Sequence, residues 1–165
     1  MLTKDFPLTV SWSQEGSNWV YYNNNGSKVT NAWRQAQDGT WRYLESSGAM
    51  ATNKWVDNDD YYVDASGIMI TNKWLQVANS RKTSGYDWYY FGNNGKCSKE
   101  KWVQIDGKYY YFGDTGAMET GWLTDGGVWY YTGSDGVMRT GWLEEGGSHY
   151  YLRGDGSMAT GWREM

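Results

Sequence analysis

Short runs of aromatic and polar residues alternate along this chain, and glycine-containing turns separate the runs. Residues 122–125 and 128–131 form one such pair of runs around Gly126 and Gly127. Two short runs that flank a Gly-Gly pair are typical of a β-hairpin with a two-residue turn. This segment therefore predicts a hairpin whose turn lies at Gly126 and Gly127.

The predicted hairpin register decides which side chains share a face, because cross-strand partners point to the same side of the pleat. We expect the pairs Asp125 with Val128, Thr124 with Trp129, Leu123 with Tyr130, and Trp122 with Tyr131. Trp122, Trp129 and Tyr131 should then lie on one face, with Leu123 and Tyr130 on the other.

The same pattern recurs with a period of about twenty residues, which is typical of a repeat array. A unit of this size cannot bury its own apolar face and must stack on its neighbours. The predicted fold is all-β, a β-solenoid of stacked hairpins over residues 12–165, with residues 1–11 as a lead-in. The repeats start near Trp12, Trp33, Trp55, Trp74, Trp102, Trp122 and Trp142.

The amino-acid composition limits the classes of function that this chain can have. The chain has 15 Tyr and 12 Trp but only 3 Phe, and Tyr and Trp suit sites that need flat, electron-rich walls with a wet edge. A net charge of −4 with scattered basic residues argues against nucleic-acid binding. No apolar run approaches the ~18 residues of a transmembrane helix, and the N-terminus lacks the apolar segment of a signal peptide. We expect an excised fragment or a removed export signal.

No catalytic motif of the HExxH, GxSxG or phosphate-loop type occurs, so we expect no enzyme activity, cofactor or metal in this chain. Cys97 replaces the Met of other repeats and is interpreted as a small buried hydrophobic residue. His149 replaces a Trp and is interpreted as an aromatic substitute. The longer segment 76–87 is interpreted as a surface excursion.

Grooves between successive hairpins would suit a quaternary ammonium ion. Such a cation cannot donate hydrogen bonds, so aromatic walls recognise it through cation-π contacts of ~0.5 to 2 kcal/mol each. For any given Trp or Tyr, packing between repeats is the competing interpretation.

The segments TGWLTDGGVWYYTGSDGVMRTGW, GKYYYFGDTGAMETGW and SHYYLRGDGSMATGW resemble the choline-binding repeat of Gram-positive surface proteins, autolysins and phage lysins. The resemblance implies a right-handed β-solenoid that binds choline or phosphocholine of teichoic and lipoteichoic acids at the bacterial cell surface. It also implies sites made of two aromatic residues from one repeat, one from the next, and often a Met. A choline-linked dimer is a further expectation from the family.

Carried onto this chain, the resemblance assigns the choline sites to matching positions. The expected sets are Trp122, Trp129, Tyr151 and Met158; Trp74, Trp88, Tyr111 and Met118; Trp33, Trp41, Tyr62 and Met69; Trp12, Trp19, Tyr43 and Met50; and Trp102, Tyr109, Tyr131 and Met138. The hairpin at Trp55 is short and has Asp60 at its second aromatic position, so we expect its site to be lost.

Two other functions stay open. A carbohydrate-binding module, similar to the repeats of glucan-binding enzymes and clostridial toxins, would also carry YYF and TGW elements. A purely structural or protein-binding solenoid is the third interpretation. Sugar sites need Asp, Asn or Gln beside an aromatic platform, whereas a choline cage needs several aromatic walls. The paired Trp residues favour the cage.

Overall fold

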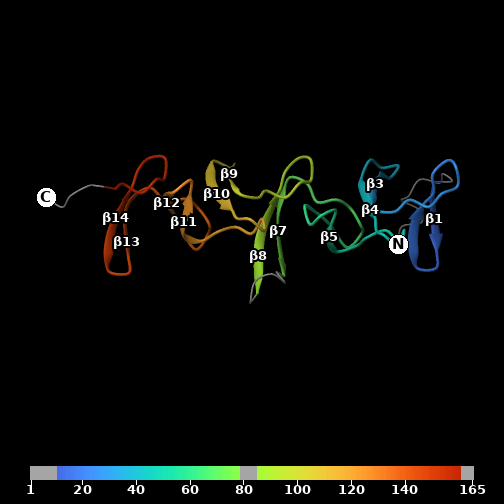
Figure 1. Ribbon diagram of the computed structural model, residues 1–165, viewed down its shortest axis with the longest axis horizontal. Coiled ribbons are helices and arrows are strands. Elements are labelled where there is room, and N and C mark those ends of the chain that lie inside the picture. Colours follow the sequence, from blue (N-terminus) through green and yellow to red (C-terminus); the bar gives the residue numbers. More distant parts are fainter. Residues whose placement is uncertain (1–10, 79–84, 161–165) are drawn as a thin grey trace. The chain divides into compact units, whose positions relative to one another are not determined.

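The computed structural model describes residues 11–78 and 85–160. Within these residues the strands form seven two-stranded sheets, each made of two consecutive strands (Figure 1). The strands are β1 (Trp12–Glu15), β2 (Asn18–Tyr21), β3 (Ala32–Gln35), β4 (Trp41–Leu44), β5 (Lys54–Val56), β6 (Tyr61–Val63), β7 (Lys73–Ala78), β8 (Tyr86–Phe91), β9 (Lys101–Ile105), β10 (Lys108–Phe112), β11 (Gly121–Asp125), β12 (Val128–Thr132), β13 (Gly141–Glu145) and β14 (Ser148–Leu152). The predicted all-β series of hairpins is confirmed. In the described residues no helix is long and apolar enough to cross a membrane.

The hairpin turn predicted at Gly126 and Gly127 is present. In β11 and β12 all four predicted cross-strand pairs are present, including Trp122 with Tyr131. The turn residues Gly126 and Gly127 have φ values of 60° and 80°. Two consecutive positive φ values are what a type I′ turn requires, and glycine adopts them without a Cβ clash.

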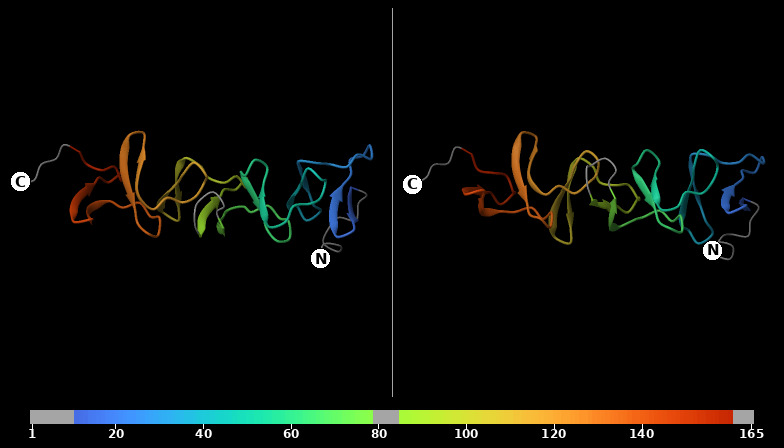
Figure 2. Two further views of the ribbon diagram at one scale, coloured as in Figure 1. Left: turned by 60° about the horizontal axis from the view of Figure 1, so that its bottom comes forward. Right: turned by 90° about the horizontal axis from the view of Figure 1, so that it is seen from below.

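A loop follows each hairpin and brings the chain to the next one (Figure 2). Isolated bridges close these loops, for example Thr132 with Met138 and Leu152 with Met158. Gly156 in the last loop packs directly on Met138, since a Cβ at Gly156 would lie 2.3 Å from the Met138 sulfur. The same loop glycine therefore allows both a positive φ and the close approach of the preceding methionine.

One backbone hydrogen bond recurs between successive repeats. The amide at the Met position of a repeat donates to the carbonyl oxygen at the second aromatic position of the preceding hairpin. The donor and acceptor pairs are Met50 to Trp19 (2.8 Å), Met69 to Trp41 (3.0 Å), Cys97 to Asp60 (2.7 Å), Met118 to Trp88 (2.8 Å), Met138 to Tyr109 (2.9 Å) and Met158 to Trp129 (2.8 Å). This bond holds each methionine beside the aromatic residue with which the sequence analysis groups it.

The chain divides into two compact units, one made of Met1–Trp74 with Tyr90–Cys97 and the other of Leu75–Tyr89 with Ser98–Met165. In every described hairpin except the first, the last residue of the second strand is buried in the core of its unit. Leu44, Val63 and Phe91 are fully buried in the first unit, and Phe112, Thr132 and Leu152 in the second. The buried Thr132 hydroxyl donates to the Glu119 carbonyl oxygen at 2.9 Å, which satisfies its only donor.

The inserted segment 76–87 lies partly outside the described residues, which omit 79–84. Its described ends belong to β7 and β8, which have six residues each, so the insertion lengthens the strands of this hairpin as well as its connection. The expected lead-in lies almost wholly outside the described residues.

Candidate functional site: aromatic cages between hairpins

A groove of about 330 Å³ lies between successive hairpins of the first unit. Its apolar walls are Trp33 and Trp41 of one hairpin with Tyr61 and Met69 of the next. The ring centroids of Trp33 and Tyr61 are 5.3 Å apart and the ring planes meet at 68°. Polar groups complete the lining, from Asp57, Thr71, Asn93 and Asn94. We call this the Trp33 cage.

A second groove, of about 290 Å³, lies in the second unit and repeats the arrangement. Trp102 and Tyr109 of one hairpin face Tyr130 and Met138 of the next, with Gly154 and Asp155 at the edge. The ring centroids of Trp102 and Tyr130 are 5.1 Å apart at an interplanar angle of 63°. We call this the Trp102 cage.

The rings around Trp122 have the same geometry. Trp129 lies 6.2 Å from Trp122 at 85°, and Tyr150 lies 4.8 Å from it at 70°. Rings that meet at nearly right angles form the corner of a recess, and the parts of their electron-rich faces outside the contact can meet a cation there. Trp129 keeps 46% of its surface exposed, so this outer wall is open to ligand. With Met158, these residues form what we call the Trp122 cage.

The structure changes the third wall of each cage by one residue. The rings packed against the preceding hairpin's Trp are Tyr61, Tyr130 and Tyr150, where the expected residues were Tyr62, Tyr131 and Tyr151. The expected tyrosines contact a Trp of their own hairpin instead, at 5.4 Å for Tyr62 with Trp55, 5.0 Å for Tyr131 with Trp122, and 5.0 Å for Tyr151 with Trp142.

Strand geometry explains this difference. Adjacent residues of a strand point to opposite faces, so a shift of one position moves a ring from one side of the hairpin to the other. Tyr131 shares the face of Trp122 and Trp129, while Tyr130 lies on the opposite face and meets the preceding Trp102. The register analysis already separated Tyr130 from Trp122, and this was the signal that could have identified the tyrosine that packs on the preceding Trp.

The expected site at Trp12 and Trp19 is built differently. Arg42 occupies the strand position that Tyr61 has in the next hairpin, because Arg42 pairs with Arg34 as Tyr61 pairs with Val56. The expected wall, Tyr43, instead lies 5.0 Å from Trp33. Trp12 is only 5% exposed and packs with Val29, Ala36, Leu44, Trp19 and Met50. This position therefore has an arginine where the three cages have an aromatic wall.

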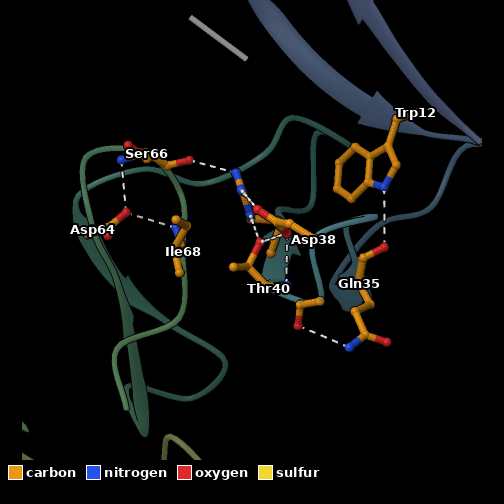
Figure 3. A network of polar contacts seen from close by, with 9 residues as sticks. Trp12, Gln35, Asp38, Thr40, Asp64, Ser66 and Ile68 are labelled. Carbon is orange, nitrogen blue, oxygen red and sulfur yellow. Dashed lines mark hydrogen bonds and ion pairs between the residues drawn. The ribbon is translucent and has the colours of Figure 1, made fainter. Parts of the chain in front are cut away.

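The Arg42 guanidinium is held by a polar network, and Figure 3 labels its partners Asp38, Thr40 and Ser66. It donates to Thr40 Oγ1 at 2.9 Å and to the Ser66 carbonyl oxygen at 2.9 Å, and it lies 3.8 Å from the Asp38 carboxylate. Hydrogen bonds from the Thr40 hydroxyl and amide, with the nearby Arg42 charge, lower the pKa of Asp38. The Arg42 side chain is only 2% exposed, so its positive charge is a fixed part of the first unit.

The expected site at Trp74 and Trp88 spans the division between the two units. Each part is described by itself: Trp74 lies 5.5 Å from Tyr90, the Met118 amide donates to the Trp88 carbonyl oxygen, and Tyr111 lies 5.2 Å from Trp102. Whether these residues bind one ligand stays a prediction.

The tyrosines behind the cages remain uncharged. Burial, assisted by the nearby Asp125, Glu100 and Glu119 carboxylates, raises the pKa of Tyr111. A hydrogen bond to Glu145 at 2.8 Å raises the pKa of Tyr131. Neutral phenol rings therefore pack against Trp102 and Trp122, and they add no negative charge of their own.

Cys97 and His149, which replace the Met and the Trp of other repeats, agree with their interpretation from the sequence. Cys97 is buried and its amide donates to the Asp60 carbonyl oxygen, as a substitute for methionine should. His149 is exposed and lies 3.6 Å from the Glu144 carboxylate.

Paired aromatic residues on stacked hairpins, each closed by a tyrosine and a methionine from the next repeat, define a repeat module with cavities for small cations. The choline-binding repeat family matches residues 9–55, 99–140 and 119–162, and a putative cell wall binding repeat matches residues 82–97. The chain belongs to the choline-binding repeat family and consists of choline-binding, cell-wall attachment repeats.

Solved structures agree with this assignment. Choline binding protein F from Streptococcus pneumoniae is 35% identical, with 92% of this chain and 52% of that chain covered and a TM-score of 0.68. The choline-binding domain of CbpL from the same organism is 30% identical over 92% of this chain and 87% of that domain, with a TM-score of 0.56. The modular autolysin LytC, also pneumococcal, is 26% identical over 93% and 39%, with a TM-score of 0.55. This chain thus spans about half the length of choline binding protein F. Comparison with curated proteins finds no match.

Proposed function

We propose that this chain is a non-catalytic module that retains a protein on the bacterial surface by binding choline or phosphocholine of teichoic and lipoteichoic acids. The proposal rests on the three-walled cage with an adjacent methionine that recurs at Trp33, Trp102 and Trp122. A quaternary ammonium ion offers only methyl groups and diffuse positive charge, so it gains from ring faces at right angles and needs no hydrogen-bond acceptor.

Several weak cages in one chain suit a polymer that presents phosphocholine repeatedly. Each cage with a few walls of ~0.5 to 2 kcal/mol binds weakly by itself. Once one cage is occupied, the neighbouring headgroups of the same polymer have a high effective concentration at the others. Retention should therefore exceed single-site affinity by a large factor.

The potential sites are unequal in this proposal. The Trp33, Trp102 and Trp122 cages bind choline, and the set at Trp74 and Trp88 is a fourth candidate. The position at Trp12 and Trp19 does not bind, because Arg42 stands where the three cages have their third aromatic wall and its fixed charge repels a second cation. The hairpin at Trp55 has Asp60 at its second aromatic position, so we assign no choline site to it.

Methionine methyl resonances can read each cage separately. In protein labelled with [¹³C-methyl]methionine, choline should shift the Met69, Met138 and Met158 signals saturably, while Met50 stays unchanged. The titration needs about 50 mM choline, far above the ~1 mM dissociation constant that corresponds to roughly 4 kcal/mol. Matched NaCl controls for ionic strength, and the neutral isostere 3,3-dimethylbutan-1-ol controls for charge.

Carbohydrate binding is the second candidate, and one observation favours it. Asp57, Thr71, Asn93 and Asn94 line the Trp33 cage and could bond sugar hydroxyl groups. An oligosaccharide titration of the same labelled protein decides between the two. Shifts with a glucan and none with choline would refute the choline proposal.

Retention on a diethylaminoethyl resin gives a separate test of choline binding. At constant ionic strength, choline should elute the protein from this resin and matched NaCl should not.

A further inference from the structure

The Trp33 cage carries a carboxylate on its own wall. The indole Nε1 of Trp33 donates to Asp57 Oδ2 at 2.8 Å, and Asp57 lines the groove together with Trp41 and Tyr61. The hydrogen bond fixes the carboxylate at the edge of a ring that a bound cation would contact. The negative charge therefore belongs to the ligand cavity.

Asp57 reaches this position because its hairpin is short. β5 and β6 are joined by the four residues 57–60, and Asp57, Asn58 and Asp59 all have positive φ, at 52°, 65° and 58°. Asn and Asp tolerate this left-handed conformation better than other residues with side chains. The hairpin that lost its second aromatic position thus contributes an acid to the preceding cage.

The second oxygen of this carboxylate is available. Within residues 11–78 and 85–160, Asp57 Oδ1 has no hydrogen-bond or ion-pair partner, and the side chain is exposed. Arg34, the residue that follows Trp33, donates to the Trp33 carbonyl oxygen at 2.8 Å and lies over the Tyr21 ring. A ligand in the cage therefore meets a free, uncompensated acceptor.

The Trp102 cage offers an internal comparison. Its carboxylate, Asp155, uses Oδ1 to accept from the Ser157 amide at 2.9 Å and from the Ser157 hydroxyl at 2.6 Å, so it closes its own loop. The loop of the Trp33 cage has Asn94 in that role, with Oδ1 accepting from the Lys96 amide at 2.9 Å. Asp57 is thus additional to the loop residue that both cages have.

We propose that Asp57 makes the Trp33 cage accept ammonium headgroups that carry N–H, of the ethanolamine type, in addition to choline. The inference rests on the proposed choline-cage function and names a ligand class for one of its sites. The methyl groups of a quaternary ammonium keep its nitrogen away from the carboxylate, and no N–H is present to donate. A protonated primary or tertiary amine can donate to Asp57 in a short, charge-assisted hydrogen bond while its cationic end faces the rings. The Asp155 carboxylate of the Trp102 cage is held within its own loop, bonds to no ring of that cage and lies near the Arg153 charge, so this cage favours the methylated headgroup.

The test compares two cages within one protein. Choline, 2-(dimethylamino)ethanol and ethanolamine are titrated as chlorides at pH 7 and constant ionic strength, with the Met69 methyl reading the Trp33 cage and the Met138 methyl the Trp102 cage. The affinity of ethanolamine relative to choline should be on the order of tenfold higher at Met69, the effect of one exposed charge-assisted hydrogen bond. Asp57→Asn should reduce this ratio to the Met138 value. Asp114→Asn, the same charge change in an exposed loop, should leave it unchanged.

A second variant guards against a local change in the turn. Asp57→Gly removes the acceptor and suits the positive φ, so it should give the same loss of ethanolamine binding as Asp57→Asn. Equal relative affinities at both cages, or a Met69 ratio that survives both substitutions, would overturn the role of Asp57 while leaving choline binding intact. If choline shifts neither methyl, the proposed function itself fails. If neutral oligosaccharides shift Met69 through Asp57 and ethanolamine does not, the acceptor serves hydroxyl groups and the ammonium inference is wrong.

Discussion

Replacing Tyr150 tests the geometry of the cages most directly. Tyr150 lies 4.8 Å from Trp122 at 70°, so it is the wall that the last hairpin contributes to the Trp122 cage. Tyr150→Leu keeps an apolar side chain of similar reach but removes the ring quadrupole. One wall is worth ~0.5 to 2 kcal/mol. For this partly exposed site we expect a loss of about 1 kcal/mol, roughly a fivefold increase in the choline Kd.

Tyr151→Leu is the matched control in the neighbouring position. Its ring lies on the other face of β14, 5.0 Å from Trp142, and is 38% exposed. This substitution should leave the choline Kd of the Trp122 cage unchanged. Tyr150→Phe, which keeps the ring and loses only the hydroxyl, should bind choline nearly as well as the wild type.

The assay is a choline titration followed at the Met158 methyl, because the Met158 amide is bonded to Trp129 of the same cage. The Met69 methyl, which reads a cage in the other unit, serves as the reference within each sample. The reasoning fails if Tyr151→Leu weakens choline binding at Met158 while Tyr150→Leu does not. That result would restore the third wall expected from the sequence.

Three further predictions concern stability. In urea denaturation, Gly156→Ala should lower the free energy of unfolding by about 2 kcal/mol more than Gly107→Ala. Both glycines have positive φ, but only Gly156 packs on Met138. Equal losses of stability would contradict the close packing of Gly156 on Met138. Arg42→Leu should lower the free energy of unfolding by about 1.5 to 3 kcal/mol, because buried hydrogen bonds from a charged donor are lost. The number of choline molecules bound per chain, measured by calorimetry, should not change. A gain of one choline per chain would show that Arg42 alone blocks the position at Trp12 and Trp19. Hydrogen bonds from the Ser157 hydroxyl and amide lower the pKa of Asp155 from its usual value of 3.8. The stabilising contribution of this carboxylate is therefore complete well above pH 3.8 and is lost as the pH falls through the lowered value. Asp155→Asn should flatten the acid-unfolding curve in this range, and an unchanged curve would contradict the prediction.

The hairpin at Gly126 and Gly127 could be predicted from the sequence because its determinants are local. Two glycines between short runs specify a type I′ turn, and that turn sets the cross-strand pairs of Trp122 through Asp125 without reference to the rest of the chain. The grouping of each methionine with the second aromatic residue was also predictable, since the repeat period places it at a constant distance along the chain. The recurring amide bond, such as Met158 to Trp129, is the structural basis of that grouping.

The repeat pattern alone did not identify the third wall, because the choice between Tyr130 and Tyr131 depends on which face of a hairpin meets the preceding one. Stacking between repeats decides this, and a difference of one position along a strand reverses the outcome.

The polar groups of the sites depended still more on tertiary structure. Asp57 bonds to an indole 24 positions away, and Arg42 bonds to the Ser66 carbonyl oxygen, also 24 positions away. Neither contact follows from the repeat pattern, because Asp57 belongs to a shortened turn and Arg42 replaces an aromatic residue. Periodicity determines what every repeat has in common, namely hairpins, aromatic pairs and methionines. The packing of one repeat on the next decides which side chains close a cage and which charges they bring to it.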